Sequence, residues 1–158
     1  MKIVYCGYHG LYISALAGYI HLWDLKTIEM RNKGYFLEWI DSINRSWLKS
    51  PGNLFYLGLD KDYNEVYSLG CKNAFDIIEK AQRGITAMYR DLDEKIYHVD
   101  LRGLEGWLYR LALDNIFEST ILQGAATQYV RYYIQRQMEK VLKRVLLVKK
   151  AIKDGELL

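Results

Sequence analysis

Proline and cysteine are scarce in this sequence, which has one proline and two cysteines among 158 residues. Cys6 and Cys71 belong to no C-x-x-C pair and lie near no histidine at zinc-ligand spacing, so we expect reduced thiols and no metal site. Hydrophobic residues make up 51% and charged residues 26% of the chain, a composition that excludes disordered and collagen-like proteins. We therefore predict a single domain over residues 1–158, long enough to bury about two-thirds of its unfolded surface.

Charged residues are absent from positions 3–23, and this apolar run imitates a secretory signal. A cleavable signal needs an unbroken apolar run, whereas a Gly-Tyr-His-Gly sequence interrupts this one at positions 7–10. His21 and the neighbouring tyrosines are also costly at bilayer depth. The sequence therefore predicts a cytoplasmic protein without a membrane segment.

The patterns of apolar and turn residues predict alternating strands and helices. β-branched and aromatic runs favour strands at 2–6, 54–59, 65–70, 95–100 and 120–123. A period of 3.6 residues favours helices at 11–23, 73–89, 104–117 and 128–153, and one or two short amphipathic helices within 24–53. Two of these helices carry apolar stripes that we expect to be buried: Ile77, Ile78, Ala81, Ile85 and Met88 in the first, and Val130, Ile134, Met138, Val141, Val145 and Ile152 in the second.

The order of these elements predicts the fold class. Strands at 2–6, 95–100 and 120–123 are each followed by a helix, which favours parallel pairing through right-handed crossovers. The two strands at 54–70 predict an antiparallel hairpin added to the sheet. The predicted fold is α/β, with a mostly parallel sheet flanked by helices in a Rossmann-like or P-loop-like three-layer arrangement and a long C-terminal helix.

Polar and glycine residues follow the three predicted parallel strands. In such sheets ligands bind outside the carboxyl ends of the strands, where loops and helix N-termini present N–H groups. We therefore expect one polar rim that holds a small anionic ligand. Its candidate residues are Gly7, Tyr8, His9, Gly10 and Ser14 after the first strand, Asp100 and Arg102 after the second, and Gln123, Gly124 and Thr127 after the third.

The first of these loops is the candidate phosphate site, because glycines admit close approach of a phosphate and the following helix dipole favours negative charge. It matches neither the P-loop nor the dinucleotide-binding glycine motif, and so it assigns no cofactor; a plain tight turn is the alternative. His9 and Asp100 are the candidate catalytic acid and base if their strands are neighbours. The alternative for Asp100 is a structural ion pair with Arg102.

The last thirty residues combine aromatic and basic side chains. Eight Lys or Arg stand against three acidic residues in 129–158, so the preceding residues total about −2 in a chain of net charge +3. We interpret the basic residues as a solvated helix face rather than a nucleic-acid surface. Tyr129, Tyr132 and Tyr133 with Arg131 and Arg136 resemble interface material, with core packing as the alternative. A non-catalytic, homodimerising interaction protein is thus the rival function.

Several segments together resemble a bacterial family, the domain-of-unknown-function family numbered 3189. They are residues 1–5, the Tyr8-x-Gly10 loop, residues 14–22, Gly58-Leu59-Asp60 and residues 64–67, and the similarity extends through most of the chain. The resemblance implies a short cytosolic protein with strand, glycine loop, helix and hairpin in this order. It implies no established activity.

The glycine loop departs from the pattern of that family, in which two adjacent glycines precede a histidine and paired serines and look like a small-anion site. Gly10 and Ser14 are retained here. His9 stands at a glycine position, Tyr12 at the histidine position and Ile13 at one serine position. These changes remove polar groups, so the resemblance leaves two expectations open: an anion site, or a loop whose family activity is altered or lost.

Overall fold

The computed structural model describes residues 1–23, 52–88, 95–118 and 123–155. Residues 24–51, predicted to contain one or two short helices, and residues 120–122 of the last predicted strand lie outside this description. The strands at 2–6, 54–59, 65–70 and 95–100 are confirmed to within one residue at each end.

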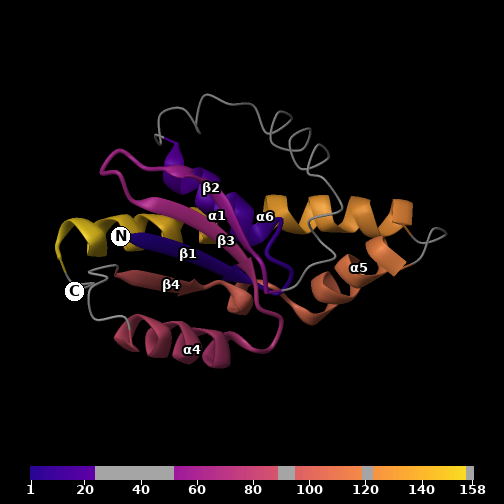
Figure 1. Ribbon diagram of the computed structural model, residues 1–158. Coiled ribbons are helices and arrows are strands. Elements are labelled where there is room, and N and C mark those ends of the chain that lie inside the picture. The colour runs from indigo at the N-terminus through magenta and orange to yellow at the C-terminus, as the bar shows by residue number, and fades with distance from the viewer. Residues whose placement is uncertain (24–51, 89–94, 119–122, 156–158) are drawn as a thin grey trace.

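One four-stranded mixed sheet organises the described residues (Figure 1). Its order is β2 (Leu54–Leu59), β3 (Glu65–Gly70), β1 (Lys2–Gly7) and β4 (Ile96–Asp100). β1 is parallel to both of its neighbours, whereas β2 pairs with β3 in an antiparallel hairpin. The mostly parallel α/β sheet and the added hairpin are therefore confirmed. The position of the hairpin was not predicted: its second strand lies inside the sheet as a parallel partner of β1.

Helices cover both faces of the sheet (Figure 1). α1 (Ile13–Leu22) and the long α6 (Gln123–Lys153) lie on one face, and α5 (Trp107–Glu118) packs against α6. α4 (Phe75–Met88) lies on the opposite face, and a short 3₁₀ turn, η2 (Arg102–Leu104), follows β4. These layers agree with an α/β fold, while assignment to the Rossmann-like or P-loop-like class stays a prediction.

The central strand β1 is buried on both faces because its side chains alternate between two apolar layers. Ile3 and Tyr5 belong to the large cluster formed with α1, α5 and α6. Val4 and Cys6 belong to a smaller cluster that contains Phe75 of α4. The apolar run at the start of the chain therefore begins as the central strand of the sheet. No helix among the described residues is both long and apolar enough to cross a bilayer.

Of the predicted strand at 120–123 the structure describes only Gln123, and there the prediction is wrong, because Gln123 is the first residue of α6. The apolar stripe expected for α6 is confirmed: Val130, Ile134, Val141 and Val145 are buried, and Met138 and Ile152 pack partly buried against the same cluster. α6 therefore begins five residues earlier than predicted.

The apolar stripe expected for α4 is largely exposed. Ile78 packs against the sheet, but Ile77, Ile85 and Met88 are 71%, 55% and 83% exposed. The helix instead turns Phe75 and Ile78 inward, and Gln82 reaches His98 of the edge strand. Periodicity identified the helix correctly but not the side that faces the sheet.

Candidate functional site

The loop between β1 and α1, residues 8–12, lies against the end of β3. The carbonyl group of Gly7 accepts a 2.9 Å hydrogen bond from the amide of Cys71, which extends the pairing of the two strands. Gly10 has a φ of +73°, and a Cβ at this position would lie 2.2 Å from the amide nitrogen of Gly70. Glycine is therefore required at position 10 both by the backbone conformation and by the close approach.

Tyr12 ends this loop in an uncommon conformation. Its φ of +60° lies in the left-handed region that residues with side chains rarely adopt, and no side chain caps the start of α1. Such outliers persist only where the surrounding structure holds them, and they cluster at functional sites. Residues 9–14 are also buried, so the loop is a packed element rather than an open surface turn.

Glu105, which the sequence analysis did not single out, reaches the start of this loop from the segment between η2 and α5. Its Oε2 accepts a 2.5 Å hydrogen bond from the amide of Tyr8. A Cβ built on Gly7 would lie 2.8 Å from Glu105 Oε1 and 3.0 Å from Ser14 Oγ, so Gly7 leaves the space in which the carboxyl group fits. The loop thus holds a carboxylate where an anionic ligand was predicted.

The environment of Glu105 favours its protonated form. The residue is only 3% exposed, and this burial raises the pKa of the carboxyl group to about 7 despite the bond from Tyr8 and the nearby charges of Arg110 and Arg102. Among the described residues its Oε1 has no hydrogen-bond partner. A carboxyl group whose pKa lies near neutral pH and that has one unbonded oxygen is a candidate proton donor or acceptor.

His9 is buried in the same region, but its acidic partner differs from the one predicted. Its Nε2 lies 2.8 Å from Oδ1 of Asp114 in α5. Burial lowers the pKa of His9, while the Asp114 carboxylate acts in the opposite direction. The pairing of β1 with β4 places Cys6 opposite Asp100, so the predicted adjacency of the strands is correct. The carboxylate that contacts His9 nevertheless comes from a helix.

Asp100 and Arg102 form the structural ion pair that was the alternative to catalysis. Arg102 Nη2 lies 2.9 Å from Asp100 Oδ2, and the Nε group bonds to both carboxylate oxygens. Burial opposes ionisation, but the bonds from Arg102 lower the pKa of Asp100. The Arg102 guanidinium also lies 4.9 Å from the ring centre of Phe75. These contacts fix Arg102 at the edge of the sheet.

Arg110 links this pair to the glycine loop. Its Nη2 donates a 2.8 Å hydrogen bond to the carbonyl oxygen of Arg102, and its guanidinium lies 5.1 Å from the ring centre of Tyr8. This cation–π contact with the Tyr8 ring holds Arg110 close to Glu105. Two positive charges, Arg102 of η2 and Arg110 of α5, therefore lie beside the loop.

Ser14 lies inside the molecule, between the loop and β3. Its hydroxyl oxygen is 3.0 Å from that of Ser68, and the Ser68 hydroxyl donates a 2.5 Å bond to the carbonyl of Gly10. Both serines are fully buried. They connect the loop, α1 and β3 through hydrogen bonds.

Gly124 and Thr127 occupy the first turns of α6. The Thr127 hydroxyl donates a 2.8 Å bond to the carbonyl of Gln123 within the same helix, and Gly124 is exposed. The structure thus brings together the loop residues Gly7, Tyr8, His9, Gly10 and Ser14, with Asp100 and Arg102 at the end of the adjacent strand, while the predicted third strand end lies outside the described residues. Across the described residues, no three His, Cys, Asp or Glu side chains form a metal-binding group.

The C-terminal tyrosines proposed as interface residues have different environments. Tyr133 stacks on Tyr109 with ring centres 4.6 Å apart, accepts a 2.8 Å bond from the amide of Gly106 and donates a 3.0 Å bond to the carbonyl of Leu104. Tyr132 is 58% exposed. Tyr133 is therefore packed within the molecule, as the alternative interpretation held, and Tyr132 alone retains the properties expected of an interface residue.

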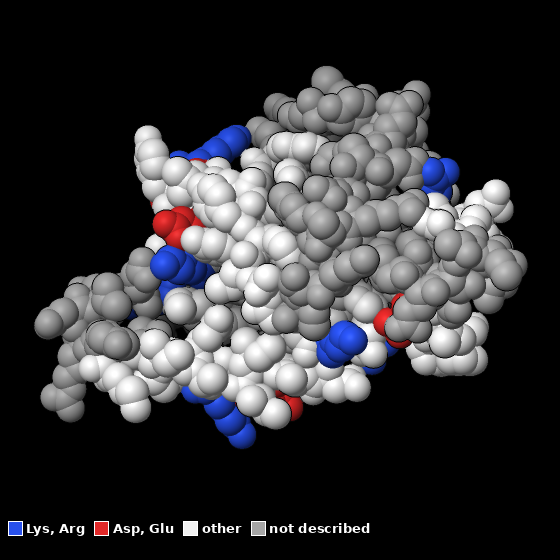
Figure 2. Space-filling view, turned by 45° about the vertical axis from the view of Figure 1, so that its right-hand side comes forward, with Lys and Arg blue, Asp and Glu red and all other residues white. Residues whose placement is uncertain are grey.

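Basic side chains are dispersed on the face seen in Figure 2, where Lys and Arg are separated by uncharged residues. A nucleic-acid surface requires a continuous basic patch with stacking or base-contacting groups. The described part of this face shows no such patch.

Comparisons with known proteins identify a family but no activity. No curated protein and no solved structure matches the chain. A family model described as "Protein of unknown function (DUF3189)" matches residues 2–150, which confirms the resemblance found in the sequence. The chain therefore belongs to the DUF3189 family of proteins of unknown function.

Proposed function

We propose that this protein binds a small phosphorylated or other anionic ligand at the loop after β1, beside Glu105 and His9. The observation that carries the proposal is the 2.5 Å bond from the Tyr8 amide to the Glu105 carboxylate. An amide of the predicted anion-binding loop thus donates to a carboxyl oxygen, the kind of acceptor that an anionic ligand would also present.

Glu105 has the properties of a ligand-binding group rather than of a structural one. Structural carboxyl groups in protein interiors have their hydrogen bonds satisfied, because a buried polar atom without a partner costs about 1–3 kcal/mol. Glu105 is buried, and among the described residues its Oε1 has no partner. A ligand oxygen at this position would accept a hydrogen bond from the protonated carboxyl group.

Positive charge near the loop favours a negatively charged ligand. Arg102 and Arg110 both act on Glu105 to lower its pKa, and Lys72 acts in the same direction on His9. In this proposal Asp100 positions Arg102, and the pair of His9 with Asp114 exchanges a proton with the ligand. This assignment replaces Asp100 by Asp114 as the carboxylate that supports His9.

The test is ligand binding at two pH values. The intact chain is screened by thermal shift against inorganic phosphate, ribose 5-phosphate, adenosine monophosphate and citrate at pH 6 and pH 8, with ionic strength held constant. A ligand that binds only the native state raises the melting temperature. We expect a larger rise at pH 6, because protonated Glu105 donates a bond to the anion and does not repel it.

Glu105→Gln keeps the shape of the side chain and removes its titration. This variant should bind the same ligand with a smaller change of affinity between the two pH values than the native protein shows, since only His9 and the ligand itself still titrate. Glu79→Gln, a change on helix α4, should behave as the native protein does. Absence of binding by every anion in the screen would overturn the proposal. So would a pH dependence in Glu105→Gln equal to that of the native protein.

A further inference from the structure

Tyr109, in the first turn of α5, carries a buried hydroxyl group that no described residue binds. The side chain is fully buried, and its oxygen has no hydrogen-bond partner among the described residues. Burial raises the pKa of Tyr109, so the hydroxyl keeps its proton and is a donor without an acceptor in that part of the chain. Such groups are rare in protein interiors because each one lowers stability. The packing of the fold thus does not explain why this position carries a tyrosine rather than a phenylalanine.

The Tyr109 hydroxyl lies beside Glu105 and the start of α1. Among charged groups the Glu105 carboxylate acts most strongly on the pKa of Tyr109 and raises it further, while the amide of Ile13, the first residue of α1, lowers it without forming a hydrogen bond. Glu105 Oε1, which also lacks a partner among the described residues, faces the same helix. It lies 2.8 Å, and Ser14 Oγ 3.0 Å, from the position of a Cβ on Gly7. Two unbonded oxygens from one segment therefore border the start of one helix.

The amino end of α1 also presents hydrogen-bond donors. α1 spans Ile13–Leu22, and the amides of its first turn have no acceptor within the helix. The side chain of its N-cap residue, Tyr12, forms no capping bond. The aligned peptide dipoles place partial positive charge at this end of the helix. The helix end, the Tyr109 hydroxyl and the protonated Glu105 carboxyl group are therefore all donors, and an acceptor between them would satisfy more than one.

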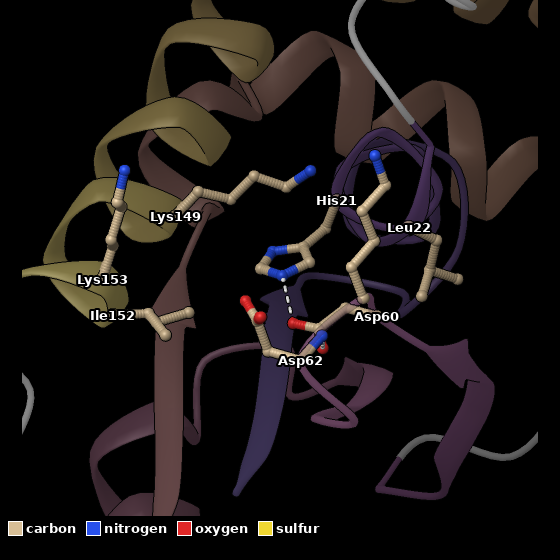
Figure 3. Close-up of a pocket in the computed structure, with 8 residues that line it drawn as sticks. His21, Leu22, Asp60, Asp62, Lys149, Ile152 and Lys153 are labelled. Atoms are coloured by element: carbon tan, nitrogen blue, oxygen red, sulfur yellow. Dashed lines mark hydrogen bonds and ion pairs between the residues drawn. The ribbon is translucent and has the colours of Figure 1, made fainter.

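The other buried tyrosine hydroxyl, at the amino ends of the strands, is bonded within the fold. The Tyr5 hydroxyl is 2.7 Å from His21 Nδ1, and His21 Nε2 is 3.2 Å from Asp60 Oδ2, the bond drawn in Figure 3. A cavity of about 320 Å³ opens beside His21 and Asp60 (Figure 3), and Lys149 in its wall is bonded to the Trp23 carbonyl. Tyr5 thus has a structural partner, whereas Tyr109 has none among the described residues.

We propose that Tyr109 is a ligand-binding residue: an oxygen of a phosphate monoester lies at the amino end of α1 and accepts hydrogen bonds from the Tyr109 hydroxyl and the Glu105 carboxyl group. The site is that of the function proposed above, on which this inference rests. An oxygen that accepts from two donors carries no proton of its own, which selects an ionised oxyanion. A phosphate monoester has three terminal oxygens, so the other two can accept from amides at the start of the helix.

The experiment measures stability and affinity in the same variants of the intact chain, because a structural hydroxyl and a ligand-binding hydroxyl change different ones. Tyr109→Phe removes only the unbonded oxygen. Its melting temperature without ligand, followed by circular dichroism, should equal or exceed that of the native protein. Its affinity for ribose 5-phosphate and for inorganic phosphate, measured by titration calorimetry at pH 6 and constant ionic strength, should fall about tenfold or more, since a hydrogen bond to a charged group is lost.

Tyr133→Phe is the matched control. The Tyr133 ring stacks on that of Tyr109 with ring centres 4.6 Å apart, but its hydroxyl is bonded to the amide of Gly106 and the carbonyl of Leu104. This variant loses two satisfied hydrogen bonds, so it should have a lower melting temperature and the native affinity. The two tyrosines are therefore expected to give opposite results.

Native affinity in Tyr109→Phe would overturn this inference and leave the proposed function intact, whether or not the melting temperature falls. Binding of citrate by the native protein, without binding of either phosphate, would contradict the ligand class alone. Absence of binding by the native protein to all three anions would overturn this inference together with the proposed function.

Discussion

The two ends of the parallel strands each bury a histidine against an aspartate, yet they differ in how completely their polar atoms are bonded. At the amino ends, Tyr5, His21 and Asp60 form a continuous chain in which both ring nitrogens and both carboxylate oxygens have partners. At the carboxyl ends, Glu105 is equally buried but keeps one oxygen without a partner among the described residues.

This difference separates a network whose polar atoms are all bonded from one that leaves a buried carboxyl oxygen unbonded among the described residues. A buried polar group with all its bonds satisfied holds a structure in one arrangement, whereas a buried carboxyl group without a partner raises the energy of the folded protein. Proteins retain such a group where it binds or reacts. The complete network near the turn frames a cavity, and the incomplete one lies within the loop itself.

The largest expected effect comes from breaking the carboxyl end at Gly10. Gly10→Ala places a Cβ 2.2 Å from the backbone nitrogen of Gly70 at a φ of +73°. We expect a loss of more than about 3 kcal/mol in the free energy of unfolding, measured by urea denaturation. Gly84→Ala is the control, because a Cβ in that helix meets no atom within 4 Å. That variant should gain up to about 1 kcal/mol, and similar losses in both variants would contradict the packed-loop description.

The next largest effect concerns the pH dependence of stability that Glu105 causes. The ordinary pKa of a glutamate is 4.5 and that of folded Glu105 is about 7, so the folded state takes up a proton between these values. Stability from this group is present below pH 4.5 and is lost as pH rises to 7. Glu105→Gln should therefore gain about 3 kcal/mol of stability relative to the native protein between pH 4.5 and pH 8, measured by urea denaturation at each pH.

The histidines act in the opposite direction in the same pH range. Burial lowers the pKa of His9 and of His21, so the unfolded chain binds protons more readily and stability falls as pH decreases below about 6.5. Because Glu105→Gln retains this loss, the difference between variant and native protein isolates the carboxyl group. Parallel stability curves for the two proteins would show that Glu105 does not titrate near neutral pH.

The smallest effect tests the complete network. Tyr5→Phe removes the hydroxyl group that bonds to His21 Nδ1 and leaves that buried nitrogen without its donor. We expect a loss of about 2 kcal/mol in the free energy of unfolding. Tyr63→Phe, at a side chain that is 82% exposed, should change stability by less than about 0.5 kcal/mol. A Tyr5→Phe protein as stable as this control would show that the network does not stabilise the fold.

Local patterns in the sequence predicted most strands and helices but not their pairing. The run at 2–6 places apolar side chains on both faces of the strand, which is typical of a central parallel strand, and β1 is such a strand. The run at 120–123 has similar composition, yet Gln123 belongs to α6. In α4, Ile77 and Ile85 follow the helical period and remain exposed, because the side that faces the sheet is chosen by tertiary contacts.

Of the candidate site, only the residues of the loop after β1 and the start of α1 could be predicted from the sequence. Gly7, Gly10 and Ser14 were identified because glycines and a helix start after a strand have a local signature. Glu105 and Asp114 have none: each is one acidic residue in or before an amphipathic helix, a position that usually faces solvent. Only the tertiary packing of α5, which lies against α6, brings them to the loop. His21 is buried, and its bonds to Tyr5 and Asp60 join segments far apart in the chain, so no local pattern announces them.

The central place of β1 has a consequence for biosynthesis. Lys2 pairs with Glu65 and Ile96, so β1 is synthesised before both of its neighbours and has to wait for them, whereas the β2–β3 hairpin closes locally. The waiting strand belongs to the stretch without charged side chains from residue 3 to residue 23. The nascent chain therefore exposes this stretch until β3 and β4 have both been made, and an exposed apolar segment is prone to aggregate.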